Sequence, residues 1–93
     1  MLDIKKGSVS IEIKGNIKTQ NHAKQIMDHL NQNERRVHFK IIDSISITSK
    51  LILHLVNFQK EYENLKITIH DKTLFNLFKE LNLVRLLNIS FKR

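Results

Sequence analysis

The sequence predicts one α/β domain over residues 1–93, built on a mixed β-sheet with helices packed mainly on one face. Short segments in which apolar and polar residues alternate predict strands, and longer segments with apolar residues three and four apart predict helices. Their order along the chain is β-β-α-β-α-β-α-β, in which strands and helices alternate after the first two strands, and this order favours such a mixed sheet. With 93 residues, 41% of them hydrophobic, the chain can fill one core but not two.

The first two predicted strands form a hairpin. Residues 8–14 read Ser-Val-Ser-Ile-Glu-Ile-Lys, a strict alternation that predicts a half-buried strand ended by Gly15-Asn16. Residues 2–6 alternate more weakly, and Gly7 can turn them back against the second strand.

After residue 19 the spacing of the apolar residues changes from every second residue to every third or fourth, as in a helix. Ala23, Ile26, Met27 and Leu30 are three and four residues apart, so we expect a helix that runs to about residue 31. Thr19 or Asn21 is available as its N-cap. The polar residues 31–34 are expected to form the loop that follows.

The middle of the chain predicts a central strand followed by a loop rich in hydroxyl groups. Residues 37–41 alternate, and the apolar run continues past the polar pair 43–44, as in a strand that leaves the sheet through a short loop. Ser46, Thr48 and Ser49 are all candidate N-caps for the next helix.

The second half predicts two more helices and two more strands. Helical spacing extends from residue 51 to about residue 61, with Asn64 as the expected stop, and residues 65–69 alternate as a strand. Asp71 or Thr73 can cap a third helix. Residues 84–91 form a last strand or an extended tail. The inner face of the third helix is expected to hold Leu74, Leu77, Phe78 and Leu81.

Leu53 and Phe75 each fall off the main apolar stripe of their helix. The stripe of the second helix is wider than packing on a sheet requires. Part of it can contact a partner, or it can be buried between neighbouring helices, and the sequence leaves both readings open.

Composition narrows the cellular setting and the partners. The chain has no cysteine, no apolar run near the ~20 residues of a membrane span and no signal-peptide pattern at its start, so we expect a cytoplasmic protein. The net charge of +7 attracts polyanions or an acidic protein partner. The basic residues form no run longer than two, and the aromatic residues mostly fall on core-facing positions, so nucleic-acid binding is not the first expectation.

Neither a cofactor site nor a catalytic site is predicted. His22 and His29 lie two helical turns apart, about 10 Å, which is too far for both to bind one ion, and no other histidine spacing or any cysteine indicates a metal site. No nucleophile motif or Gly-rich phosphate loop is present. We therefore expect no metal, no cofactor and no enzymatic activity.

The order and the residues together resemble the STAS domains, the family of anti-sigma-factor antagonists. Residues 9–17, Val-Ser-Ile-Glu-Ile-Lys-Gly-Asn-Ile, and the helix after them are similar to the family's opening strand, Gly-x-Leu turn and helix. The Ser/Thr-rich loop with the helix 51–62, and the closing residues 82–89, Asn-Leu-Val-Arg-Leu-Leu-Asn-Ile, are also similar to family elements. The resemblance covers about residues 8–91.

The chain departs from the family at its diagnostic motif. Phosphorylation-switch members carry Asp-Ser-x-Gly at the start of the second helix, and a lipid-transport subgroup carries Asp-Thr-Gly-Gly. Here residues 47–51 read Ile-Thr-Ser-Lys-Leu, without the Asp or the Gly, and Lys18 replaces the acid of the turn after the second strand. A phosphate on a hydroxyl at this helix N-terminus would nevertheless be stabilised by free backbone N–H groups. The alternative is that these hydroxyls are ordinary caps and loop residues.

The resemblance implies a regulatory interaction module without catalytic activity. Its partner would be the ATPase of a lipid-transport ABC system, which the second helix favours, or an anti-sigma factor or kinase. A small basic nucleic-acid-binding protein is the alternative function. The candidate partner-binding residues, with the possible phosphorylation sites among them, are Ser46, Thr48, Ser49, Lys50, His54 and Asn57.

Overall fold

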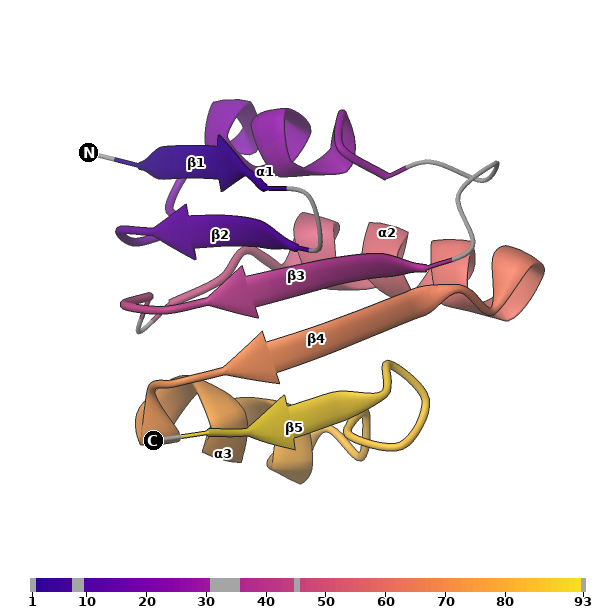
Figure 1. Cartoon of the computed structure of the whole chain (residues 1–93). Coiled ribbons are helices and arrows are strands. Elements are labelled where there is room, and N and C mark those ends of the chain that lie inside the picture. The colour runs from indigo at the N-terminus through magenta and orange to yellow at the C-terminus, as the bar shows by residue number, and fades with distance from the viewer. Residues whose placement is uncertain (1, 8–9, 31–35, 45, 93) are drawn as a thin grey trace.

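The structure, a computed structural model, describes residues 2–7, 10–30, 36–44 and 46–92. Its five strands form one sheet in the order β1-β2-β3-β4-β5, so strands next to each other in the sheet are also consecutive along the chain (Figure 1). The element order is the one that the sequence predicts. The elements are β1 (Asp3–Lys6), β2 (Ile11–Lys14), α1 (Gln20–Met27), β3 (Val37–Ile41), α2 (Ser49–Tyr62), β4 (Leu65–Ile69), α3 (Lys72–Glu80) and β5 (Ile89–Phe91).

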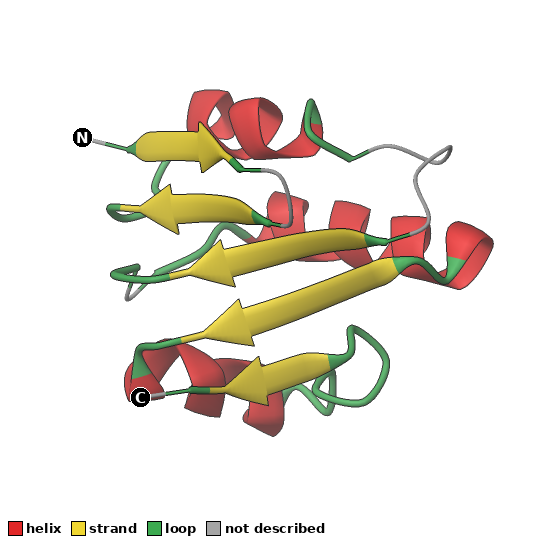
Figure 2. Ribbon diagram, viewed as in Figure 1, coloured by secondary structure: helices red, strands yellow, loops and turns green. Residues whose placement is uncertain are grey.

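The sheet is mixed. Strand β1 pairs antiparallel with β2 and places Ile4 opposite Ile13, which confirms the predicted hairpin, and every other pair is parallel. A parallel pair needs a crossover connection, and α1, α2 and α3 supply it. All three helices lie on one face of the sheet, behind it in Figures 1 and 2, and the other face is left without a helix.

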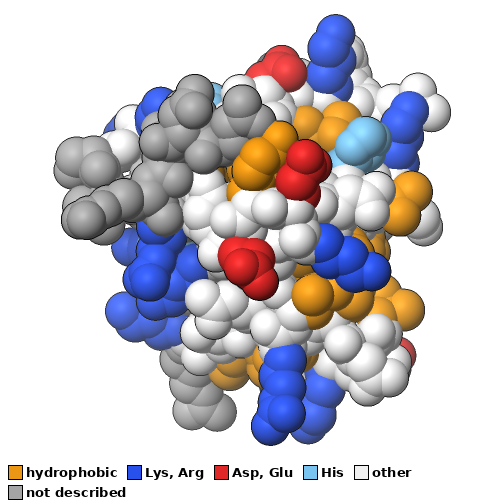
Figure 3. All heavy atoms as spheres, turned by 90° about the vertical axis from the view of Figure 1, so that its right-hand side faces the viewer, with side chains coloured by type: hydrophobic (Ala, Val, Ile, Leu, Met, Phe, Trp, Pro, Cys, Tyr) orange, Lys and Arg blue, Asp and Glu red, His pale blue; other side chains and the backbone are white. Residues whose placement is uncertain are grey.

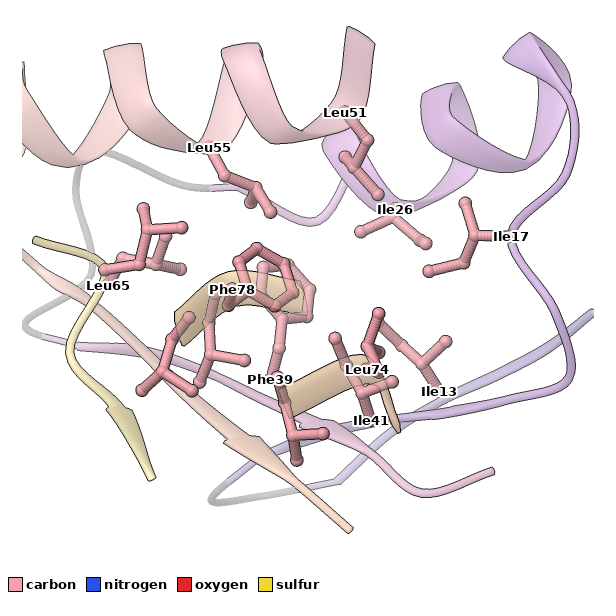
Figure 4. Close-up of a cluster of buried hydrophobic side chains, with 14 of the residues drawn as sticks. Ile13, Ile17, Ile26, Phe39, Ile41, Leu51, Leu55, Leu65, Leu74 and Phe78 are labelled. Carbon is pink, nitrogen blue, oxygen red and sulfur yellow. The ribbon is translucent and has the colours of Figure 1, made fainter. Parts of the chain in front are cut away.

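The core fills the space between the sheet and its three helices. Strand β3 shows the alternation directly, with Val37, Phe39 and Ile41 buried and the two residues between them partly exposed. In Figure 4, Leu51 and Leu55 point from α2 toward the sheet. The other fully or nearly buried apolar residues are Ile11, Ile13, Ile17, Ala23, Ile26, Leu65, Ile67, Ile69, Leu74, Phe78, Leu87 and Ile89.

Two helices end at residues other than those predicted. Helix α1 ends at Met27, because the backbone N–H groups of His29 and Leu30 bond to carbonyls only three residues back. Helix α2 ends at Tyr62, and its C-cap is Glu63, which has the left-handed conformation with φ 54, rather than the predicted Asn64. The predicted residues 8–9, and the loop 31–34, lie outside the described residues.

The C-terminal segment is wound rather than extended. Only residues 89–91 pair with β4, and residues 84–88 form turns in which the N–H of Leu87 bonds to the carbonyl of Leu83 at 2.9 Å. This winding places Leu87 in the core with no exposed surface. Leu81, which the sequence assigns to the inner face of α3, is instead the C-cap residue and is 47% exposed.

The face of the sheet opposite the helices is polar. The cross-strand neighbours there include Glu12 beside Lys40, Lys40 beside Thr68, and His38 beside Lys66. The Nε2 atom of His38 lies 2.8 Å from the hydroxyl oxygen of Thr68. We call this surface the open sheet face. The sequence predicts it as the polar half of the strand alternation.

Candidate functional site

The loop before α2 is tied to the loop after β2. The hydroxyl of Ser44, which is completely buried, donates a hydrogen bond to the carbonyl oxygen of Gly15. A few residues on, the N–H of Ile17 reaches the carbonyl oxygen of Ser46 at 3.4 Å. Gly15 itself has φ 95, a conformation that residues with a side chain rarely adopt. Together these contacts fix the position from which α2 starts.

The three predicted hydroxyl groups have three different environments. The Oγ1 atom of Thr48 accepts a hydrogen bond from the N–H of Leu51 at 3.2 Å, so Thr48 is the N-cap of α2. The hydroxyl oxygen of Ser46 is shielded from solvent and has no hydrogen-bond partner within the described residues. Ser49 is exposed in the first turn of the helix. Only Ser49 therefore offers a hydroxyl that an enzyme can reach without first disrupting a buried group or the cap.

The outward face of α2 carries the remaining predicted residues. Lys50, His54 and Asn57 are all exposed, and their spacing of three and four places them along one stripe of the helix. Leu53 lies beside this stripe and is 58% exposed, the largest fraction among the exposed large apolar residues described. The buried stripe of the same helix contains Leu51 and Leu55. The structure thus resolves the open question about Leu53: it is not buried between helices.

The N-terminus of α2 is electropositive. Its first turn contains no acidic residue, and Lys50 lies within that turn. The backbone dipoles add a partial positive charge at the same end. An acidic side chain or a phosphate is the natural counterpart of such a surface.

A histidine with a shifted pKa, His38, lies away from α2, on the open sheet face. The pKa of His38 is lowered, first by burial and then by the positive charges of Lys66, Lys40 and Arg36. Because neighbouring cations contribute to the lowered pKa of His38, the electrostatic potential on this face is positive. It does not point to acid–base chemistry at α2.

Metal binding finds no support in the described part of the chain. No group of three or more His, Asp or Glu residues is close enough to hold an ion there. His22 lies on α1, where its Nδ1 accepts a hydrogen bond from the N–H of Lys18 at 3.2 Å, whereas His29 lies beyond the helix end.

Within the described residues, no helix is long and apolar enough to cross a membrane.

Comparison of the chain with known proteins finds no matching family model, curated protein or solved structure. The resemblance to STAS domains therefore depends on the residue pattern and on the element order alone. What the structure confirms is the predicted fold, a mixed sheet with helices on one face.

Sequence reasoning did not find a second polar cluster, at the end of the sheet where β2 and β3 finish. Six residues line a solvent-open pocket of about 410 Å³ there, close to the Ser44–Gly15 contact. Five of them lie within residues 14–22, and only the fold brings Asp43 to them, so no local motif predicts the whole set. The lining residues are Lys14, Gly15, Asn16, Lys18, His22 and Asp43.

Proposed function

We propose that the chain is a non-enzymatic, STAS-type interaction module that binds a cytoplasmic protein partner through the outward face and N-terminus of α2. The observation that carries this proposal is the 58% exposure of Leu53 next to the polar stripe of Lys50, His54 and Asn57. Interfaces commonly have this composition, with an apolar anchor that becomes buried and a polar rim around it.

The fixed position of the helix start supports the same proposal. Ser44 and Thr48 hold the loop and the first turn in place through a buried hydrogen bond and a cap. A preorganised surface loses less conformational freedom on binding than a flexible one. The surface therefore suits a partner that docks on a rigid helix end.

The partner class comes from the resemblance to STAS domains. An ABC-transporter ATPase is the first candidate and an anti-sigma factor or kinase the second. In either case Lys50 and the positive helix end favour an acidic patch on the partner. A kinase partner would require an accessible hydroxyl, and among the three candidates Ser49 meets that requirement. Phosphate at Ser49 would reverse the local charge and disrupt such an interface.

The test is an affinity capture with the tagged protein from its own cell lysate, washed at moderate and then high salt, with mass spectrometry of the retained proteins. Leu53→Asp is the interface variant, and Glu61→Lys, an exposed change farther along the same helix, is the control. We expect an ATPase or a kinase to be retained at high salt by the wild type and the control and lost by Leu53→Asp. A partner retained equally by all three proteins would move the interface away from α2.

Nucleic-acid binding is the second candidate function, and the open sheet face favours it. Lys40, Lys66 and Arg36 lie there close enough to His38 to depress its pKa. Figure 3 views the molecule onto the ends of the strands, and Lys and Arg side chains are seen there in several separate groups. Such a surface would contact phosphates without reading bases. Its binding would fall steeply with salt, with a log–log slope of about −0.9 per duplex phosphate neutralised.

The two functions separate in a salt titration with labelled duplex DNA and RNA. Lys40→Gln combined with Lys66→Gln should abolish nucleic-acid binding if the second function is right, and Leu53→Asp should not change it. Protein capture that survives high salt supports the first function instead.

A further inference from the structure

The pocket at the ends of β2 and β3 has the composition of an anion site. Lys14 and Lys18 supply two ammonium groups, and Asp43 is the one carboxylate among the described residues that line it. Both lysines are exposed. Positive charge in a concave site concentrates anions.

His22 adds an oriented hydrogen-bond donor. Its Nδ1 accepts a hydrogen bond from the N–H of Lys18, so in the neutral ring the proton resides on Nε2. The same turn contains the N-cap, where Thr19 accepts from the N–H of His22 at 3.1 Å. The first contact orients the ring of His22, which lines the pocket, and the second fixes the backbone of the helix residue that carries the ring. The Nε2–H group can then donate to an oxyanion that the lysines attract.

We propose that this pocket binds the phosphate group of a small phosphorylated polyol, with Lys14, Lys18 and His22 on the phosphate and Asp43 on a hydroxyl of the ligand. A pocket of about 410 Å³ lies in the range of small-molecule sites and has room for more than a phosphate group. The carboxylate of Asp43 would repel a second anionic group but accepts a hydrogen bond from a hydroxyl. The lining thus selects one phosphate and a neutral, hydroxyl-bearing remainder.

This site is independent of the proposed partner interface. Its residues lie on β2, on the loop before α1, on α1 and after β3, whereas the interface is on α2. Loss of one activity therefore need not affect the other.

The experiment is a titration of the ¹⁵N-labelled protein, followed by amide chemical shifts at constant ionic strength. The probes are glucose 6-phosphate, inorganic phosphate and glucose. We expect glucose 6-phosphate to give saturable shifts confined to residues 14–22 and 43, inorganic phosphate to shift the same residues with at least threefold weaker affinity, and glucose to shift none. Shifts that do not saturate, that spread over the cationic surface, or that are absent with both phosphates would overturn the proposal.

Variants test the individual roles. Lys14→Gln with Lys18→Gln should weaken glucose 6-phosphate binding at least tenfold, and Lys18→Gln alone, outside any helix or strand, at least threefold. The control, Lys24→Gln with Lys60→Gln, removes the same charge from two exposed lysines that do not line the pocket and should change affinity less than twofold. Equal losses in the two double variants would mean that only net charge matters and would refute the site.

Asp43→Asn should weaken the binding of glucose 6-phosphate but not the binding of inorganic phosphate. Weaker binding of both would refute the hydroxyl role of Asp43.

Discussion

Two leucines of α2, two residues apart, should respond to truncation very differently. Leu55 is 2% exposed and lies in the core, whereas Leu53 is 58% exposed on the outward face. We expect Leu55→Ala to lower the free energy of unfolding by about 2–5 kcal/mol, the usual cost of a cavity left by a buried leucine. For Leu53→Ala we expect less than about 1 kcal/mol, because less than half of its side chain is removed from water and alanine favours a helix slightly more.

These free energies translate into melting temperatures. For a domain of this size, 1 kcal/mol shifts the melting temperature by about 4–8 °C. Leu55→Ala should therefore melt at least about 8 °C below the wild type, and Leu53→Ala within about 8 °C of it. Urea unfolding followed by circular dichroism measures both variants, with equal denaturant slopes as the check that the denatured states match. Equal destabilisation by the two variants would show that Leu53 is buried and would remove the anchor of the proposed interface.

The remaining predictions concern the cap, the loop contact, the helix end and pH. Thr48→Ala should cost about 1 kcal/mol of unfolding free energy, and Thr48→Ser should restore most of it, because the lost group is the cap oxygen at Leu51. Ser44→Ala should cost about 1–3 kcal/mol by leaving the carbonyl of Gly15 without its hydroxyl donor; a neutral result in urea unfolding would contradict the contact. Glu63→Gly should raise the unfolding free energy by up to about 1 kcal/mol, since glycine adopts φ 54 without steric cost, and a loss of stability would argue against that conformation. Because burial and nearby cations lower the pKa of His38 in the folded state, folding favours its neutral form; its stabilising contribution is present above the unfolded pKa of 6.5 and is lost as pH falls through the folded pKa. His38→Gln should therefore show a weaker loss of stability than the wild type in thermal melts as pH falls below 6.5, and identical pH profiles would contradict the shift.

The sequence predicts elements well where one signal dominates. Strand β4 is found at its predicted residues 65–69, because alternating apolar residues bury one face there. Thr48 and Asp71 are among the predicted caps, and each accepts a hydrogen bond from the backbone N–H three residues ahead. Local chemistry fixes these features, so a local pattern can find them.

The prediction fails where tertiary contacts decide between two locally reasonable structures. The apolar residues 84–87 suit a strand, but Asn82 with φ 58 reverses the chain after α3, and turns then carry Leu87 into the core. At the candidate site, the exposure of Lys50 follows from helical spacing. The contact of Ser44 with Gly15 joins residues 29 positions apart, and the pocket joins residues 14–22 to Asp43. These residues come together only because β2 and β3, which are separated by α1 in the sequence, pair side by side in the sheet.

The sequential strand order has a consequence for how the protein is made. Each strand added to the sheet finds its neighbour already synthesised, because β2 pairs with β1, β3 with β2, β4 with β3 and β5 with β4. During translation, which adds about 5–20 residues per second, the sheet can therefore grow from its first hairpin toward its last strand without waiting for a distant partner. The wound segment with Leu87 and then β5 arrive after β4 and α3, and the side chain of Leu87 joins the core. Until both are in place the growing chain exposes apolar surface beside β4, so chaperone contact with the nascent chain should be concentrated at this step.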